Sequence, residues 1–182
     1  MNKQFDKVRR ADRQETETGF LYGILSDTLT CSVAVSTPTH PLLHSTFFAF
    51  DHLTQEIIFH FSKYGFAGEQ ILDGREVTIS GYKYGKLYTA EKAVDFGGEY
   101  QSVIVYGKIR IISEEQEKLK AMEFFFDRFF PHIPKSDYKN FTPSEANPIS
   151  VAKVKIDKWF GKEHRVPDKA TSAFYSSISP ML

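Results

Sequence analysis

The sequence predicts an α+β fold built on about six antiparallel strands. Segments rich in β-branched and aromatic residues, with alternating apolar and polar positions, recur along the chain and are separated by turn residues. Two of the longest carry an interior glycine, Gly81 or Gly107. Such glycines commonly mark the bend that lets a small sheet curl closed. We therefore expect an antiparallel barrel with flanking helices.

The first third of the chain predicts one helix followed by three strands. Asp12 and Glu15 have capping-box spacing, and apolar residues then recur at helical intervals, so a short amphipathic helix is expected over 12–26. Residues 29–62 alternate, with turn residues at 36–41 and a hairpin-length connector at 51–55. This pattern predicts a three-stranded antiparallel meander.

A short helix and two long strands are expected next. The apolar residues of 65–74 lie between two glycines, which favours a short helical crossover. Residues 75–90 and 100–113 predict long strands, and 91–99 connects them.

The last third predicts a longer helix, a loop and a final strand. Ser113 and Gln116 form a second capping box, and the helix that follows should end at Pro131. Four prolines fall within 131–150, and a loop of this length is expected to cover a site or a subunit seam. Residues 151–160 alternate and supply the last strand. We expect one domain over 1–182, with its core at 8–162 and a loosely held tail at 163–182.

Composition and charge exclude several classes of function. The chain has 23 basic and 23 acidic side chains, so no bulk field favours nucleic acid or an anionic membrane. No stretch approaches the roughly 20 apolar residues that span a bilayer, and the start lacks the apolar core of a secretion signal. A cytosolic location is the expectation. The 17 Phe and 9 Tyr indicate a core, an interface or a planar-ligand pocket built largely from rings.

Metal binding and nucleophilic catalysis have weak support. His40 and His44 have the spacing of a helical metal pair, but Pro41 and the flanking pattern predict a strand, which would hold them about 13 Å apart. Cys31, the single cysteine, lies in an apolar alternating strand with no base beside it in sequence, as a buried inert thiol does. No metal site is expected, and no hydrolase elbow, phosphate loop or dinucleotide fingerprint occurs.

The segment 56–68 contains polar residues that packing alone does not explain. In a strand, Ile58, His60 and Ser62 share one face, and Lys63 and Gly65 follow directly. A polar strand face that leads into a glycine-containing turn can present hydroxyl, ammonium and backbone N–H groups to a phosphate. A hydrogen-bonded core histidine before an ordinary turn is the alternative interpretation. Ser102, near the start of a long strand, could add a hydroxyl to the same anion or could simply begin that strand.

The order of these pieces resembles the FMN-binding split-barrel superfamily that includes the pyridoxamine 5'-phosphate oxidases, and most closely its nitroimidazole-resistance-like branch. The resemblance covers about 8–162. It is carried in chain order by Arg9-Arg10, Asp12-Arg13, Ile24-Leu25, the run CSVAVST, His40-Pro41, Phe59-His60, Lys63, Gly65, Tyr100-x-Ser102-Val103, Gly107 and Gly161-Lys162.

This resemblance implies a six-stranded antiparallel split β-barrel that forms a homodimer and binds FMN between its subunits. The flavin ring would then lie along the strand that contains Ser45, Thr46 and Phe47. His60 and Ser62 would lie near the cofactor, with His60 as a polar or acid catalytic group. Lys63, Gly65 and Ser102 would lie near the ribityl-phosphate end.

The sequence departs from the family pattern after Gly65. Relatives usually carry a basic pair there, where this chain has Phe66 and Ala67. The loss of one charge-assisted contact to a phosphate costs about 1.5 to 3 kcal/mol, or about ten- to hundredfold in affinity. Lys63, Arg75 and Lys108 are candidates for compensating it. The chain also lacks the arginine-rich ending of true pyridoxamine-phosphate oxidases, which argues against vitamin B6 oxidation.

Three hypotheses remain open from the sequence. The first is a dimeric FMN oxidoreductase that passes electrons from a reduced nicotinamide donor to a small acceptor, for example a nitroaromatic compound. The second is a non-catalytic split-barrel module that holds another planar ligand such as haem. The third is a purely structural dimer whose rings serve only the core and the seam.

Overall fold

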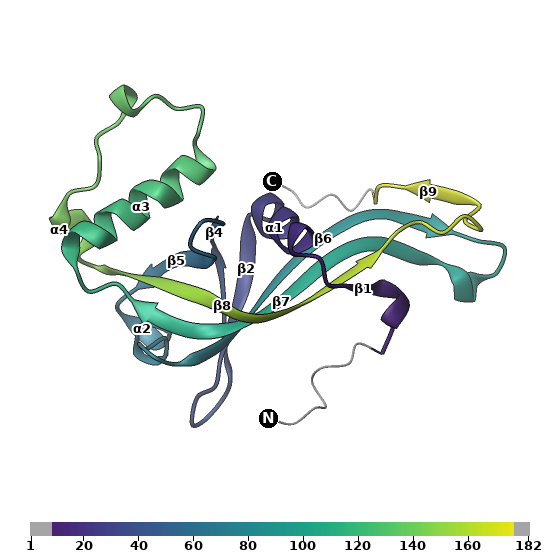
Figure 1. Ribbon diagram of the computed structural model, residues 1–182, viewed down its shortest axis with the longest axis horizontal. Coiled ribbons are helices and arrows are strands. Elements are labelled where there is room, and N and C mark those ends of the chain that lie inside the picture. The colour runs from purple at the N-terminus through teal and green to yellow at the C-terminus, as the bar shows by residue number, and fades with distance from the viewer. Residues whose placement is uncertain (1–8, 177–182) are drawn as a thin grey trace.

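A curled antiparallel sheet forms the centre of the computed structural model, which describes residues 9–176 (Figure 1). The strands follow the order β3-β2-β6-β7-β8-β5-β4, with β1 paired to β8 and β9 paired to β6. The α+β class is therefore confirmed. The described residues form nine strands where about six were expected, because three short strands join the sheet. The strands are β1 (Gln14–Glu15), β2 (Thr30–Val35), β3 (Leu42–Phe47), β4 (Ala49–Asp51), β5 (Glu56–Ser62), β6 (Glu76–Thr89), β7 (Gly97–Ile111), β8 (Ile149–His164) and β9 (Ser172–Phe174).

The sheet closes into a barrel through the link between β3 and β4. These two strands lie at opposite ends of the strand order, yet only Phe48 separates them in sequence. The Phe48 side chain is fully buried, so the chain turns inward there and passes from one sheet edge to the other. The predicted three-stranded meander over 29–62 is therefore wrong. β3 pairs only with β2, and β5 pairs with β4 and β8.

The main core fills the barrel and is closed by the first helix, α1 (Thr18–Asp27). Leu21, Ile24 and Leu25 of α1 pack with inward-facing residues of the strands. The helix begins later than the predicted residue 12, because Asp12 does not form the expected capping box. Its carboxylate instead accepts hydrogen bonds from Arg10 within and beside a 3-10 turn at Ala11–Arg13.

Long strands β6, β7 and β8 extend beyond the barrel as an arm, seen on the right in Figure 1. Gly107 lies at a register shift between β7 and β8, as expected for a bend. β1 and β9 pair along this arm. The predicted loose tail is therefore corrected in part, since β8 continues to His164 and residues 172–174 pair with β6; residues 177–182 lie outside the described part of the chain.

Two helices follow β5 and β7. The short helix α2 (Gly65–Gln70) agrees with the predicted crossover, and Gly65 adopts a positive φ of 81° that favours glycine. The long helix α3 (Glu115–Phe129) ends before Pro131 as predicted, but its N-cap is Glu114 rather than Ser113. The predicted loop over 131–150 contains a 3-10 turn at Lys135–Asp137 and the short helix α4 (Pro143–Ala146), and β8 starts within it.

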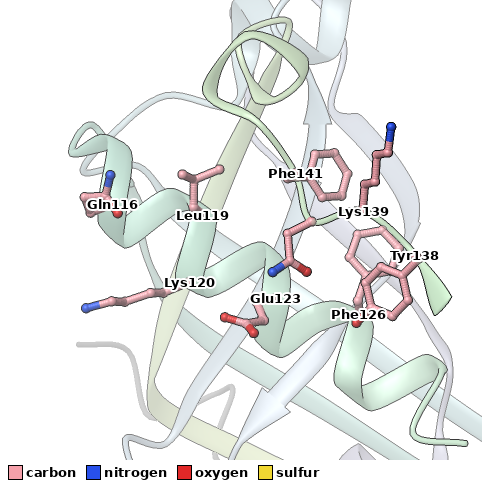
Figure 2. Close-up of a pocket in the computed structure, with 9 residues that line it drawn as sticks. Gln116, Leu119, Lys120, Glu123, Phe126, Tyr138, Lys139 and Phe141 are labelled. Atoms are coloured by element: carbon pink, nitrogen blue, oxygen red, sulfur yellow. The ribbon is translucent and has the colours of Figure 1, made fainter. Parts of the chain in front are cut away.

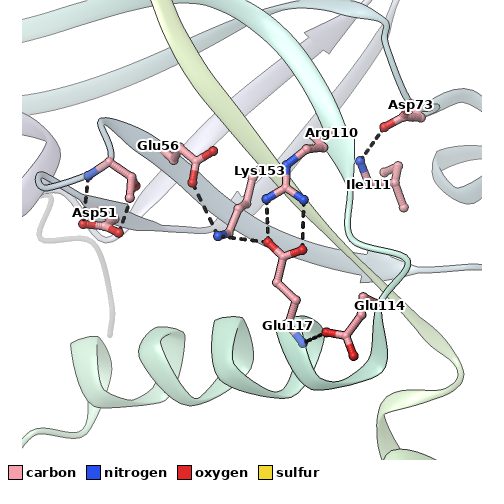
Figure 3. A network of polar contacts seen from close by, with 9 residues as sticks. Asp51, Glu56, Asp73, Arg110, Ile111, Glu114, Glu117 and Lys153 are labelled. Carbon is pink, nitrogen blue, oxygen red and sulfur yellow. Dashed lines mark hydrogen bonds and ion pairs between the residues drawn. The ribbon is translucent and has the colours of Figure 1, made fainter.

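α3 packs over the outer surface of β5 and β8. Ala121 and Met122 of α3 contact Ile58 and Val151 in a second, smaller core. An ion-pair network also holds the first turns of the helix (Figure 3). Arg110 of β7 donates to both carboxylate oxygens of Glu117 at 3.0 and 2.6 Å, and the Lys153 ammonium lies 3.4 Å from both Glu117 and Glu56. The hydrogen bonds from Arg110 have the largest effect, and together with the contact to Lys153 they lower the pKa of Glu117 to about 2.

No helix within residues 9–176 is long and apolar enough to cross a membrane.

Candidate functional site

His60 lies in β5 on the outer surface of the barrel. Phe59 and Phe61 alternate with it and belong to the core, which confirms the predicted division of the strand into two faces. The imidazole stands edge-on to Phe125 of α3, with ring centroids 4.9 Å apart. Its Nδ1 is buried and has no hydrogen-bond partner in the described part of the chain. Buried polar atoms are rarely left unpaired, so this nitrogen is a candidate ligand contact.

A second histidine of the same kind, His44, lies in β3. Its Nε2 is also buried without a hydrogen-bond partner within residues 9–176. Its ring stands edge-on to Phe61, with ring centroids 6.2 Å apart. Burial lowers the pKa of His44. Burial, and then the charge of His44, lower the pKa of His60. Burial therefore favours the neutral form of both imidazoles, in which one ring nitrogen donates a hydrogen bond and the other accepts one.

The other predicted flavin contacts on β3 divide between its two faces. Thr46 points inward with His44, and its hydroxyl lies 3.1 Å from the carbonyl oxygen of Phe47 and 3.5 Å from that of His60. This contact lies at the seam between β3 and β5, where the two strands are not paired as a ladder. Ser45 and Phe47 point outward. The Ser45 and Ser32 hydroxyl oxygens are 3.3 Å apart, and the exposed Phe47 ring contacts Phe129 of α3.

The predicted anion-binding residues follow directly after β5. The Ser62 hydroxyl accepts a hydrogen bond from the backbone N–H of Tyr64, and the Lys63 ammonium donates to the side chain of Asn147 at 3.2 Å. Lys118 of α3, which the sequence analysis missed, lies close enough to be affected by the charge of Lys63. Burial and then the charge of Lys63 lower the pKa of Lys118. Its ammonium donates to the carbonyls of Ala146 and Ile149.

The structure does not replace the missing basic pair locally. Phe66 is half exposed, and Ala67 packs against the barrel core. Of the candidate substitutes, Arg75 donates to the carbonyl of Ser36 at 2.6 Å, and Lys108 stands opposite Glu76 across the strand pair.

Ser102 does not join His60 and Lys63 within one chain. It lies in β7 between Tyr82 of β6 and Lys162 of β8. β7 ends at Ile111, and the backbone N–H of the next residue, Ile112, donates to the carbonyl of Val151, the β8 partner of His60. Ser102 is therefore about 30 Å away along the strand. Ser102 does share the outer sheet face with Ser45. Across the sheet, Ser45 pairs with Ser32, Ser32 with Ser80 and Ser80 with Ile104, which lies two residues from Ser102 on the same face.

A cavity of about 410 Å³ lies between α3 and the loop that follows it, lined by residues of both (Figure 2). This volume is in the range of small-molecule sites. Phe126 and Phe141, whose ring centroids are 5.2 Å apart, form an aromatic wall together with Tyr138, and residues of α3 line the other side. The long loop therefore does cover a cavity, although none of the predicted site residues lines it.

The environment predicted for Cys31 can be compared with the structure. Cys31 is buried, and burial raises the pKa of its thiol to about 12, as for an inert cysteine. Within residues 9–176, no group of three His, Cys, Asp or Glu side chains is arranged to hold a metal ion.

The curled antiparallel sheet, its long arm and its covering helix define the class as a split-barrel α+β protein. The family model described as pyridoxamine 5'-phosphate oxidase matches residues 20–163, which is most of the chain. The chain therefore belongs to the pyridoxamine 5'-phosphate oxidase family. A search of curated protein sequences found no match.

Solved structures share this fold at low sequence identity. The flavocytochrome Anf3 from Azotobacter vinelandii is similar with a TM-score of 0.79 and 20% identity, over 88% of this chain and 73% of that one. An FAD and heme binding protein from Mycobacterium smegmatis gives a TM-score of 0.77 and 20% identity, over 86% and 76%. A putative 5-nitroimidazole antibiotic resistance protein from Bacteroides thetaiotaomicron gives 0.67 and 16%, over 82% and 86%.

Proposed function

We propose that the protein is a homodimeric flavoprotein that binds FMN and passes electrons from a reduced nicotinamide donor to a small acceptor, for example a nitroaromatic compound. The observation that carries the proposal is the seam between β3 and β5. His60 Nδ1 on the outer face of β5 and His44 Nε2 on the inward face of β3 border this seam as buried ring nitrogens without partners in the described chain; Lys63 follows β5 directly, and Lys118 of α3 lies close to its charge. Membership of the family supports flavin binding, as do two similar structures described as a flavocytochrome and as an FAD and heme binding protein.

The residues at the seam suit a flat heteroaromatic group. Within residues 9–176, β3 pairs with β2 on one side only, so the backbone N–H and C=O groups of its other edge can bond ring heteroatoms. Leu43 and Phe47 add exposed apolar surface beside Ser45. When bound, FMN supplies the hydride and electron chemistry. The neutral His60 imidazole would donate or accept one hydrogen bond, and α3 would exclude water through Phe125 and Phe129.

A homodimer is part of this proposal because one chain does not bring all predicted contacts together. Ser102 lies on the exposed outer sheet face, far along the arm from Lys63. A second copy placed against this face would bring a Ser102 toward the Lys63 end of its neighbour. Tyr82 and Tyr84 on the same face are more than half exposed, which suits a surface that another chain covers.

A haem-binding module is the second candidate. It is favoured by the unpartnered His44 and His60 nitrogens, since imidazole is a common axial ligand of haem iron. Two similar structures are described as a flavocytochrome and as an FAD and heme binding protein.

Ligand titration of the purified protein decides between these candidates. With FMN we expect a perturbed visible flavin spectrum, quenched flavin fluorescence and a raised melting temperature. A parallel haem titration would sharpen the Soret band and shift it to longer wavelength relative to free haem if a histidine binds the iron. Absence of every flavin signal, together with this shifted Soret band, would replace the first proposal with the second.

A His60→Ala variant tests the role of the imidazole. We expect altered turnover with NADH and a nitroaromatic acceptor, or an altered flavin reduction potential, with little change in the melting temperature. His52→Ala, at an exposed turn residue, is the matched control. A severe stability loss in His60→Ala with unchanged flavin properties would instead assign His60 to the packing of α3.

A further inference from the structure

Arg13 lies in an unusual polar cluster on the arm. One guanidinium nitrogen donates to the Tyr100 hydroxyl at 3.4 Å, and another lies 3.3 Å from Nε2 of His164. The same His164 nitrogen is 2.7 Å from the hydroxyl of Tyr88, a buried side chain. The Nε of Arg13 is buried and has no hydrogen-bond partner within residues 9–176.

The charge of Arg13 is not neutralised by a carboxylate in the described part of the chain. The adjacent Asp12 is held by two nitrogens of Arg10 at 2.8 and 2.6 Å. Glu163 accepts hydrogen bonds from Gln101 and Arg165. A permanently charged guanidinium that is half buried among neutral partners is costly, and an anion would relieve that cost.

The positive field of this cluster acts on His164. Burial lowers the pKa of His164, and the charges of Arg13 and Arg10 lower it further, while Asp12 opposes them. The balance of two guanidiniums against one carboxylate therefore leaves the cluster positive.

The cluster lies beside Ser102. In the strand register, Tyr100 pairs with His164, and two positions along, on the same face, Ser102 pairs with Lys162. Tyr82 pairs with Ser102 and its ring is stacked on Tyr100, with centroids 6.1 Å apart. A guanidinium, two hydroxyl groups and an aromatic flank are thus gathered on the outer sheet face.

We propose that Arg13, assisted by Ser102 and Tyr100, binds a phosphomonoester, namely the phosphate of the flavin nucleotide, and so replaces the basic pair that Phe66 and Ala67 displace. This inference rests on the proposed flavin function. Three of the five N–H groups of Arg13 remain beyond the two contacts described, and one of them is the unpartnered Nε. Arginine suits a phosphate because its planar fork can donate two parallel hydrogen bonds.

Comparison of FMN with riboflavin tests the phosphate contact directly, because riboflavin has the same ring and lacks the phosphate. In Arg13→Gln we expect the Kd for FMN to rise about ten- to hundredfold and the Kd for riboflavin to stay the same. Arg165→Gln, which alters a more exposed arginine at the same end of β8 that is paired with Glu163, is the matched control and should change neither value.

Two further measurements keep the test independent of folding. If Arg13→Gln does not fold by circular dichroism, Arg13→Lys and Ser102→Ala replace it in the same comparison, and each should weaken FMN selectively. In the unaltered protein, the Arg13 Nε–H resonance should shift with FMN and with inorganic phosphate, but not with riboflavin.

The outcomes distinguish failure of the phosphate site from failure of flavin binding. Equal affinity of the unaltered protein for FMN and riboflavin, or equal weakening of both by Arg13→Gln, would overturn the phosphate site while leaving flavin binding intact. Binding of neither flavin would overturn the proposed function and this inference with it.

Discussion

Single buried imidazoles set the chemistry of the seam. His44 and His60 each keep a buried ring nitrogen unpaired in the described chain, and burial lowers the pKa of both. A protein that only needed packing at these positions would gain from apolar side chains, because an unsatisfied buried polar atom costs about 1 to 3 kcal/mol. The free energy given up there is consistent with a ligand-binding role.

The lowered pKa values predict that stability falls with acidity. In the unfolded chain a histidine titrates near 6.5. Below that pH the unfolded chain binds protons that the folded chain resists, so the free energy of unfolding decreases, by at most about 1.4 kcal/mol per pH unit for each histidine. Urea unfolding at pH 7.5 and 5.5 measures the change. The loss should be smaller in His60→Gln and in His44→Gln than in the unaltered protein, and equal losses in all three proteins would contradict the prediction.

At the scale of elements, Gly107 lets β7 lie close to the backbone of β8 at the bend. A Cβ atom on Gly107 would lie 2.3 Å from the Lys155 carbonyl oxygen and 2.7 Å from a Val154 methyl group. Gly81 in β6 is less constrained, since its Cβ would meet only a Val103 methyl at 3.2 Å. Backbone cannot yield as a side chain can, so the two glycines differ in importance.

Gly107→Ala should therefore destabilise the protein by about 3 kcal/mol, while Gly81→Ala should cost about 1 kcal/mol or less. Gly23→Ala is the control for adding a methyl group in open space, and on helix propensity it should stabilise α1 by about 0.5 to 1 kcal/mol. Urea unfolding at neutral pH measures all three. Similar losses in the free energy of unfolding for Gly107→Ala and Gly81→Ala would show that the backbone can relax at the close approach of β7 and β8.

For the whole molecule, the outer sheet face is the main uncovered surface that carries predicted site residues. Ser45, Phe47 and Ser102 lie on it, and Tyr82 is 56% exposed there. The proposed phosphate contact at Arg13 lies on the same arm. Flavin binding and dimerisation are therefore expected to depend on each other.

Tyr82→Glu should weaken the dimer, because it places a charge on a face that would be buried between two chains. We expect sedimentation velocity to show a dimer for the unaltered protein and a monomer for Tyr82→Glu, with FMN binding lost in parallel. Leu53→Glu, at a residue that is 84% exposed on the turn between β4 and β5, should remain dimeric. A Tyr82→Glu protein that stays dimeric and retains FMN would place the subunit contact elsewhere.

Local pattern was sufficient for much of the fold and for the type of site. Alternation predicted the strands and the separation of His60 from Phe59 and Phe61, because neighbouring residues of a strand point to opposite faces. Apolar spacing and Pro131 predicted α3 and its end. The ordered motifs pointed to the family that the comparison confirms.

Only the tertiary structure decided how distant segments meet. The barrel closes at Phe48 because the two edges of a curled sheet must join, and nothing in the alternating sequence marks that point. Tertiary structure also places Ser102 away from His60, packs the α3 rings over the seam and brings Arg13 into contact with His164. Each of these arrangements involves residues that are far apart in the chain. Side-chain periodicity reports which face a residue occupies, whereas strand order and register decide its neighbours.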